Sequence, residues 1–210
     1  RSGRRGPRRA DHRGAESADN VTGDGAGILM QIPHDFFVAQ GISLPEPGRY
    51  GTGLVFLPVV EEEAAFCVEV LNRYIEAEGL TLVKWRDVPV DSSVIGEIAR
   101  STEPSIRQVF VKGNYEQDVL ERKLYLARKQ AERVVRESKL AHKESFYLPS
   151  FSSRVMIYKG MFTPSQLRDY FKDLSHPEMK SAIALVHSRL STNTFPTWDL
   201  AQPFRMIAHN

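Results

Sequence analysis

Residues 52–88, TGLVFLPVVEEEAAFCVEVLNRYIEAEGLTLVKWRDV, contain the pattern that decides the fold. The segment 52–58 is a short apolar run closed by a proline, which predicts a buried strand. From 61 to 78, apolar residues recur every three or four positions and Gly79 follows, which predicts an amphipathic helix that ends there. Residues 80–88 alternate partly between apolar and polar, so a second strand is expected. The apolar stripe of the helix consists of Ala64, Val68, Leu71 and Ile75.

The same two periodicities continue in both directions along the chain. Further strands are predicted at 25–33, at 105–113, twice within 145–162 around a Ser-rich bend, and at 181–190. Further helices are predicted at 34–40, 115–138 and 163–171. The last of these has Thr163 as N-cap, Pro164 as first helical residue and Gln166 as capping-box partner. Because strands come in groups with helices between them, a layered α+β fold is expected, not a regular βαβ alternation.

Composition places the chain among ordinary globular proteins. Of its 210 residues, 41% are hydrophobic and 26% are charged, which is enough apolar surface for a real core. No apolar run approaches the ~20 residues of a membrane span, and no secretory signal is visible. The single cysteine excludes an internal disulfide and fits a reducing compartment, so a cytoplasmic protein without a membrane partner is expected.

The net charge of +2 is carried by one end of the chain. Residues 1–14 contain six Arg and one Asp, whereas the rest of the chain has 22 basic and 25 acidic residues. A basic tail can bind nucleic acid, but no aromatic residue is interleaved here to stack on bases. Residues 1–11, RSGRRGPRRAD, are therefore expected to be a disordered, solvated tail with no nucleic-acid partner.

Two other polar features favour structural interpretations. The Gly-rich segment 10–28 lacks the phosphate-loop pattern and calcium-loop spacing, so a turn before a buried strand is expected. Cys67 lies between two apolar residues of the predicted helix with no base nearby, and we expect it to be buried and inert. None of the six histidines forms a ligand pair at helical spacing, so no metal site is expected.

The segment 186–210, VHSRLSTNTFPTWDLAQPFRMIAHN, concentrates the residue types that hold polar ligands. Arg189, at the end of a predicted strand, has the donor geometry to grip a carboxylate through two parallel hydrogen bonds. Ser191 and Thr192 add short donors and acceptors, and the Asn210 amide could stabilise an oxyanion. The alternative is a structural loop whose polar side chains bond their own backbone. Composition alone leaves these two interpretations even.

Longer motifs resemble the large subunit of the glutamate synthase family. They are HRGAESADNVTGDGAGILMQIPHDFF (12–37), YGTGLVFLP (50–58), WRDVPVD (85–91), FYLPSFSSRVMIYKGM (146–161) and HSRLSTNTFPTWDLAQPFRMIAHN (187–210). They occur in the family's order, within its glutamine amidotransferase domain. The resemblance implies that residues 12–210 form part of such a domain. It also implies the four-layer αββα sandwich of the N-terminal-nucleophile hydrolases.

The resemblance also implies a chemistry and a set of partners. In such enzymes an N-terminal Cys thiolate attacks glutamine, its own α-amine acts as base, and ammonia is released. The ammonia passes to a second domain, where 2-oxoglutarate becomes glutamate. That domain uses FMN, an iron–sulfur cluster and electrons from NADPH, delivered by a small subunit, or from ferredoxin. No cofactor is expected within these 210 residues.

Carried over by motif, the resemblance assigns four roles. Arg189 holds the α-carboxylate of glutamine, Asn210 is the oxyanion-hole asparagine, and Arg13 supports the nucleophile site. Ser191 and Thr192 line the glutamine pocket. The chain departs from the family pattern because the nucleophilic Cys, the first strand and the C-terminal part of the domain are missing. An incomplete sandwich that is inactive alone is therefore expected. A non-catalytic remnant, a glutamine-binding module and another amidotransferase of the same class are the alternatives.

Overall fold

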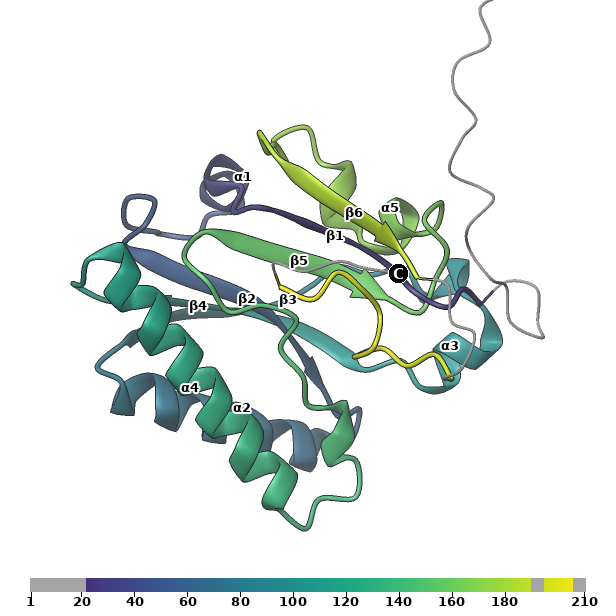
Figure 1. The fold of residues 1–210 in the computed structure, drawn as a ribbon, viewed down its shortest axis with the longest axis horizontal. Helices are drawn as coiled ribbons and strands as arrows, with labels where there is room; N and C mark the ends of the chain where they lie inside the picture. The colour runs from purple at the N-terminus through teal and green to yellow at the C-terminus, as the bar shows by residue number, and fades with distance from the viewer. Residues whose placement is uncertain (1–21, 190–194, 206–210) are drawn as a thin grey trace, which may run out of the picture.

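The computed structural model describes residues 22–189 and 195–205, which form two antiparallel three-stranded sheets and a set of helices (Figure 1). The strands are β1 (Ala26–Gln31), β2 (Tyr50–Leu57), β3 (Thr81–Asp87), β4 (Ser105–Lys112), β5 (Val155–Gly160) and β6 (Ala184–Ser188). The α-helices are α1 (His34–Ala39), α2 (Glu61–Ala77), α3 (Glu97–Ser101), α4 (Gln117–Glu137) and α5 (Leu167–Tyr170). Short 3₁₀ helices are η1 (Ser92–Val94), η2 (Lys143–Ser145) and η3 (Lys172–Ser175).

The first sheet has the order β2-β4-β3 and lies between a helical layer and the second sheet. Its residues alternate between two cores, as the period of a strand requires. Leu54 and Phe56 of β2 belong to the core between the sheets, whereas Val55 and Leu57 belong to the core beneath α2 and α4. Both faces of this sheet are thus buried, which explains the continuous apolar run in β2.

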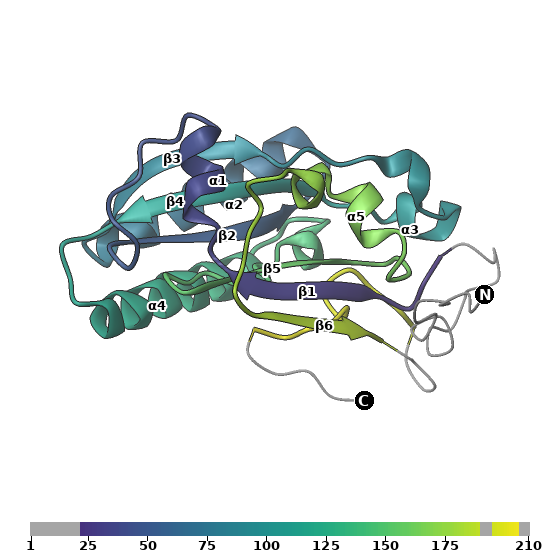
Figure 2. The same cartoon turned by 90° about the horizontal axis from the view of Figure 1, so that it is seen from above.

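Helices α2 and α4 pack side by side against the outer face of the first sheet (Figures 1 and 2). Their predicted apolar stripes are confirmed at the positions that face the sheet. The buried side chains of α2 include Leu71 and Ile75, and those of α4 include Leu120, Leu124, Ala127 and Ala131. Tertiary burial of these stripes, more than intrinsic helix propensity, stabilises both helices.

The second sheet has the order β5-β1-β6 and brings together segments far apart in the sequence. Ala26 of β1 pairs with Gly160 of β5 on one side and with Ser188 of β6 on the other. Its inner face contributes Ala26, Met30, Met156 and Tyr158 to the core between the sheets. The predicted mixture of helices and strands is confirmed, with a helical layer and two sheets. The four-layer αββα order that the resemblance implies stays a prediction.

A buried polar network ties the two sheets together. Arg86 of β3 pairs with Asp173 of η3, and the Tyr158 hydroxyl of β5 donates to the same carboxylate at 2.9 Å. Arg86 Nε also donates to Gln108 Oε1 at 2.8 Å, and its guanidinium lies over the Phe37 ring at 5.5 Å. Burial and the adjacent Asp173 carboxylate raise the pKa of Tyr158, so its hydroxyl remains a donor.

Two local predictions were wrong. Only β5 forms within 145–162, because the chain before it contacts β2 through isolated bridges at Tyr147 and Ser152. Glu121 of α4 accepts hydrogen bonds from the Ser152 and Ser153 hydroxyls, at 2.9 and 2.7 Å. These bonds hold the Ser-rich bend against α4, so that its residues do not extend into a second strand.

The helix predicted at 163–171 also begins later than expected, since α5 starts at Leu167. The capping-box partner is nevertheless in place. Gln166 Oε1 accepts from the Thr163 N–H at 2.8 Å, but residues 164–166 form a turn that precedes the helix. The side-chain contact was therefore predicted correctly, whereas the N-cap role of Thr163 and the helical position of Pro164 were not.

Strand β6 is the least buried part of the described fold. It forms one edge of its sheet, beside β1 (Figure 2). Ile183 and Val186 keep 68% and 59% of their surface exposed, which is unusual for apolar side chains beside a sheet. An apolar edge of this kind is a ready surface for pairing with further polypeptide.

Candidate functional site

Arg189 lies at the end of β6, where the outer face of the second sheet is built from small residues of β1. Its backbone N–H donates to the Gly25 carbonyl at 2.7 Å, which continues the β1–β6 ladder by one bond. His187 pairs with Gly27 and Gly27 with Lys159, so these three positions form a row across the sheet. Strand alternation therefore places Arg189 on the same outer face as this row, away from the core between the sheets.

The segment 197–205 crosses that outer face, and two glycines make room for it. A Cβ atom at Gly27 would lie 2.5 Å from the Gln202 carbonyl oxygen and 2.6 Å from Lys159 Cβ. A Cβ atom at Gly25 would lie 2.9 Å from Ala201 Cβ, and Gly25 has a φ of +135° that disfavours other residues. Residues 201–202 therefore pack directly against the sequence DGAGI at 24–28.

The segment is fixed by its own turn and by one aromatic anchor. The backbone N–H groups of Leu200 and Ala201 both donate to the Thr197 carbonyl at 3.2 Å. The buried Trp198 side chain donates from Nε1 to the Ala99 carbonyl of α3 at 3.1 Å. The Gln202–Pro203 peptide bond is cis. These contacts hold the chain in one path above Gly25 and Gly27.

Lys159 is the most unusual residue of this face because its ammonium group is fully buried. Lys159 Nζ donates to the carbonyls of Asp199 at 2.8 Å and Ala201 at 2.7 Å, and to the Tyr147 hydroxyl at 3.2 Å. It also lies 4.5 Å from the Tyr147 ring centroid and 4.6 Å from that of Phe204. Burial lowers the pKa of Lys159 to about 7, against the opposing effect of the Asp199 carboxylate.

Arg205 stands at the end of the segment in a strained conformation. Its φ of +48° is uncommon for a residue with a side chain, and such residues cluster at functional sites. Arg205 lies 3.9 Å from Glu132 Oε1 of α4, which also pairs with the buried Arg128 at 3.2 Å. Desolvation lowers the pKa of Arg128 although Glu132 partly offsets it.

Two hollows flank the segment. One of about 280 Å³ is mainly apolar and includes Phe56, Met161 and Trp198 in its walls. The other, of about 250 Å³, is polar and includes Glu132 and Arg205. The segment therefore separates an apolar side from a charged side, and Asp199 lines both hollows.

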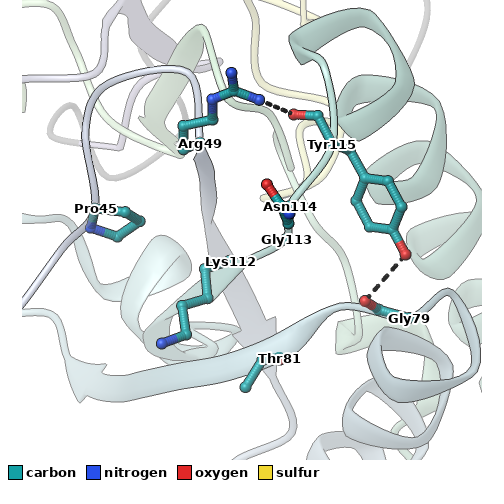
Figure 3. Close-up of a pocket in the computed structure, with 8 residues that line it drawn as sticks. All are labelled: Pro45, Arg49, Gly79, Thr81, Lys112, Gly113, Asn114 and Tyr115. Carbon is teal, nitrogen blue, oxygen red and sulfur yellow. Dashed lines mark hydrogen bonds between the residues drawn. The ribbon is translucent and has the colours of Figure 1, made fainter.

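A larger hollow lies elsewhere in the described part of the chain. It measures about 690 Å³, is open to solvent and is lined by Arg49, Lys112 and Tyr115 among others (Figure 3). It sits where β2 begins, and Tyr50 there bonds His34, just beyond the end of β1, at 3.1 Å. The hollow is thus at the opposite end of β1 from Arg189, and it is separate from the face described above.

The structure brings Arg189 to the expected strand end, while the other predicted site residues are not described. Arg13, Ser191, Thr192 and Asn210 lie outside residues 22–189 and 195–205. Their roles, and that of Arg189, stay predictions. No group of His, Cys, Asp and Glu that could hold a metal is found among the described residues.

The remaining sequence expectations can be compared directly. The expectation that Cys67 is buried is confirmed, and burial raises the pKa of its thiol to about 12. Lys159 and Arg205 were missed. The only sequence signal was a lysine inside an apolar strand pattern, YKG at 158–160, where such a side chain normally reaches solvent. Within the described residues, no helix is both long and apolar enough to span a membrane.

Comparison with known proteins agrees with the earlier resemblance. The family described as Glutamine amidotransferases class-II matches residues 5–210. The chain is 46% identical over 205 residues to the "Glutamate synthase [NADPH] large chain" of Bacillus subtilis, covering 95% of this chain and 13% of that protein. It is 40% identical over 214 residues to "Glutamate synthase [NADH]" of Schizosaccharomyces pombe, covering 95% and 10%.

A third relative carries a different electron donor in its name. The chain is 40% identical over 206 residues to the "Ferredoxin-dependent glutamate synthase, chloroplastic" of Oryza sativa subsp. japonica, covering 95% of this chain and 13% of that protein. The chain thus spans roughly an eighth or less of the length of these relatives. Nearly all of its residues are nevertheless covered by the match. The chain belongs to the class-II glutamine amidotransferase family.

Proposed function

We propose that this chain binds glutamine on the outer face of the β5-β1-β6 sheet, as the glutaminase region of a glutamate synthase. The observation that carries the proposal is the placement of Arg189. Its backbone is bonded to Gly25, at the end of the face that residues 201–202 cover. A guanidinium carried by a residue at that point is suited to a bidentate pair with the α-carboxylate of glutamine.

The other predicted residues complete this proposal. Ser191 and Thr192 follow Arg189 in the chain and line the glutamine pocket, and Asn210 donates to the developing oxyanion. Arg13 supports the place of the nucleophile. A neutral amide suits the oxyanion role because it can donate to the developing charge without a proton transfer during the reaction.

The nucleophile is the part that these 210 residues do not supply. The family mechanism uses a thiolate whose own α-amine acts as base, and the only cysteine here is Cys67. Cys67 lies inside α2 with no exposed surface, and burial raises the pKa of its thiol to about 12. We therefore propose that this chain by itself binds glutamine without hydrolysing it, which is also how a glutamine-binding module would behave.

For a longer glutamate synthase we propose the full reaction that the family implies. Glutamine is hydrolysed to glutamate and ammonia, and the ammonia then converts 2-oxoglutarate to glutamate with electrons from a nicotinamide cofactor or ferredoxin. FMN and an iron–sulfur cluster would serve that second step. This chain does not fit an iron–sulfur cluster, since such clusters need several thiolates and Cys67 is single and buried.

Titration calorimetry with L-glutamine tests the proposal. Wild-type chain is expected to bind, and Arg189→Gln is expected to weaken binding at least tenfold, because one charge-assisted bidentate pair is lost. Arg168→Gln is the matched control, since Arg168 is exposed and bonds only Ser175 among the described residues. Equal affinity of wild type and Arg189→Gln would refute the carboxylate role. Ammonia release that copurifies with the chain would refute the absence of hydrolysis.

A further inference from the structure

We propose that Lys159 is a positioning residue, whose buried ammonium holds residues 199–203 against β1 and β5 and so fixes the wall of the glutamine site beside Arg189. The inference rests on the proposed glutamine site. It assigns a function to a fully buried charged side chain that is bonded to the carbonyls of residues 199 and 201. An apolar residue of similar length would fill the same volume of a sheet face at lower desolvation cost.

Most of the contacts of the Lys159 ammonium are with one short segment. Two of its three hydrogen-bond acceptors are the Asp199 and Ala201 carbonyls, and the Phe204 ring covers the ammonium from the same segment. The third acceptor, the Tyr147 hydroxyl, precedes β5 in the chain. Lys159 therefore joins the sheet to residues 199–204 through directional hydrogen bonds. These bonds fix the position of the segment on the sheet, whereas apolar contacts alone would allow it to shift.

The same segment lies directly beside the residues of the candidate site. Ala201 is in contact distance of Gly25, whose carbonyl accepts the Arg189 N–H. The Gln202 carbonyl lies over Gly27, which pairs with His187 of β6. A shift of residues 201–202 would therefore change the wall that faces Arg189. Lys159 does not touch this region of β6 itself, so its effect on a ligand is transmitted by the segment.

The charge state of Lys159 decides how many bonds it can donate. A charged ammonium satisfies the two carbonyls and the hydroxyl together, but a neutral amine has only two N–H donors. Burial lowers the pKa of Lys159 to about 7. The bonds from Lys159 to the carbonyls of residues 199 and 201 therefore weaken as pH rises through neutrality. The titratable and charged groups around it are Asp199 and Arg205 of the segment, Tyr147 before β5, Glu132 and Arg128 of α4, and His187 across the sheet.

The test compares wild type with Lys159→Met, whose unbranched side chain is one heavy atom shorter and has no hydrogen-bond donor. Lys172→Met is the matched control because Lys172 is half exposed and pairs with Asp91 outside this face. His187→Gln controls for the histidine that lies across the sheet from Lys159. Each variant is measured by calorimetric glutamine titration at about pH 6 and about pH 8. Hydrogen exchange of residues 199–204 is measured at the same two values, relative to the Lys172→Met control.

Wild type and both controls are expected to bind glutamine roughly three- to tenfold more weakly at the higher pH, with faster exchange in 199–204. Lys159→Met is expected to bind weakly at both values, with no pH step in affinity or in exchange. If Lys159 had only a structural role, Lys159→Met would be less stable than wild type, but its glutamine affinity would depend on pH as the affinity of wild type does. A pH step that survives in Lys159→Met, or that disappears in His187→Gln, would overturn the inference.

The proposed function and this inference fail in different ways. If wild type binds no glutamine at either pH, the glutamine site is refuted, and hydrogen exchange alone then decides whether Lys159 holds the segment. If hydrogen exchange in residues 199–204 depends on pH in wild type but not in Lys159→Met, the result supports the inference that Lys159 holds this segment. Exchange in 199–204 that is identical in wild type and Lys159→Met would refute it, whatever the chain binds.

Discussion

Asp173→Asn is expected to destabilise the chain by about 3–5 kcal/mol, because it leaves the Arg86 guanidinium buried without a counter-charge. The two side chains are only 12% and 4% exposed, and Asp173 is the one carboxylate among the described residues that pairs with Arg86. Asp173 also accepts from the Tyr158 hydroxyl at 2.9 Å, so the variant disturbs a contact between η3 and both sheets. Tyr158→Phe removes only that one bond and should cost less, about 1.5–3 kcal/mol.

Urea unfolding followed by tryptophan fluorescence measures these differences, since Trp85 adjoins Arg86 in β3. The matched control is Asp118→Asn, which removes an exposed Arg–Asp pair with side chains 51% and 79% accessible and should cost less than about 1 kcal/mol. Replacing both partners, as Arg86→Met with Asp173→Leu, should recover at least part of the loss. A cost below about 1 kcal/mol for Asp173→Asn would refute the view that burial makes this pair important.

Three further outcomes are expected. Gly27→Ala should cost about 1–3 kcal/mol in urea unfolding, because its Cβ would lie 2.5 Å from the Gln202 carbonyl oxygen, and unchanged stability would contradict the close packing. Cys67 should react with a thiol reagent at pH ~8 only as fast as the chain unfolds, since its pKa is raised to about 12, and rapid stoichiometric labelling would contradict this. Hydrogen bonds from Lys172 and Ser93 lower the pKa of Asp91 from 3.8 to about 2. Its stabilising effect is therefore complete above pH 3.8 and lost as pH falls toward 2, so the urea midpoints of wild type and Asp91→Asn should differ at pH ~6 and converge near pH ~2.

Helices α2 and α4 were predictable because their apolar residues follow one period over many turns. The segment before β5 was not, because its apolar residues alternate like a strand while Glu121, from a distant helix, binds the serines that would extend the ladder. No local pattern encodes such a contact. The error at 145–162 is therefore a case of tertiary structure overriding local preference.

In the candidate site, too, some residues were predictable from the sequence and others were not. Arg189 was predictable because an arginine after an apolar run falls at a strand end, where polar side chains become accessible. Lys159 was not, because its role depends on carbonyls of residues 199 and 201, which the fold brings to it from about 40 positions away. A single sequence shows which residues can carry a charge, but it does not show which backbone oxygens will surround that charge.

The pairing of β1 with β5 and β6 also has a consequence for how the chain acquires its structure. The β2-β4-β3 sheet and its two helices use only residues 50–137, whereas β1 must wait for residues 155–160 and 184–188. During synthesis at about 5–20 residues per second, β1 would stay without its first partner, β5, for roughly 6 to 26 seconds. The order of assembly is thus set by loop closure, with the first sheet forming early and the second late. Until then the apolar side chains of Ile28 and Met30, which the finished fold packs between the sheets, stay exposed and are a natural target for a chaperone.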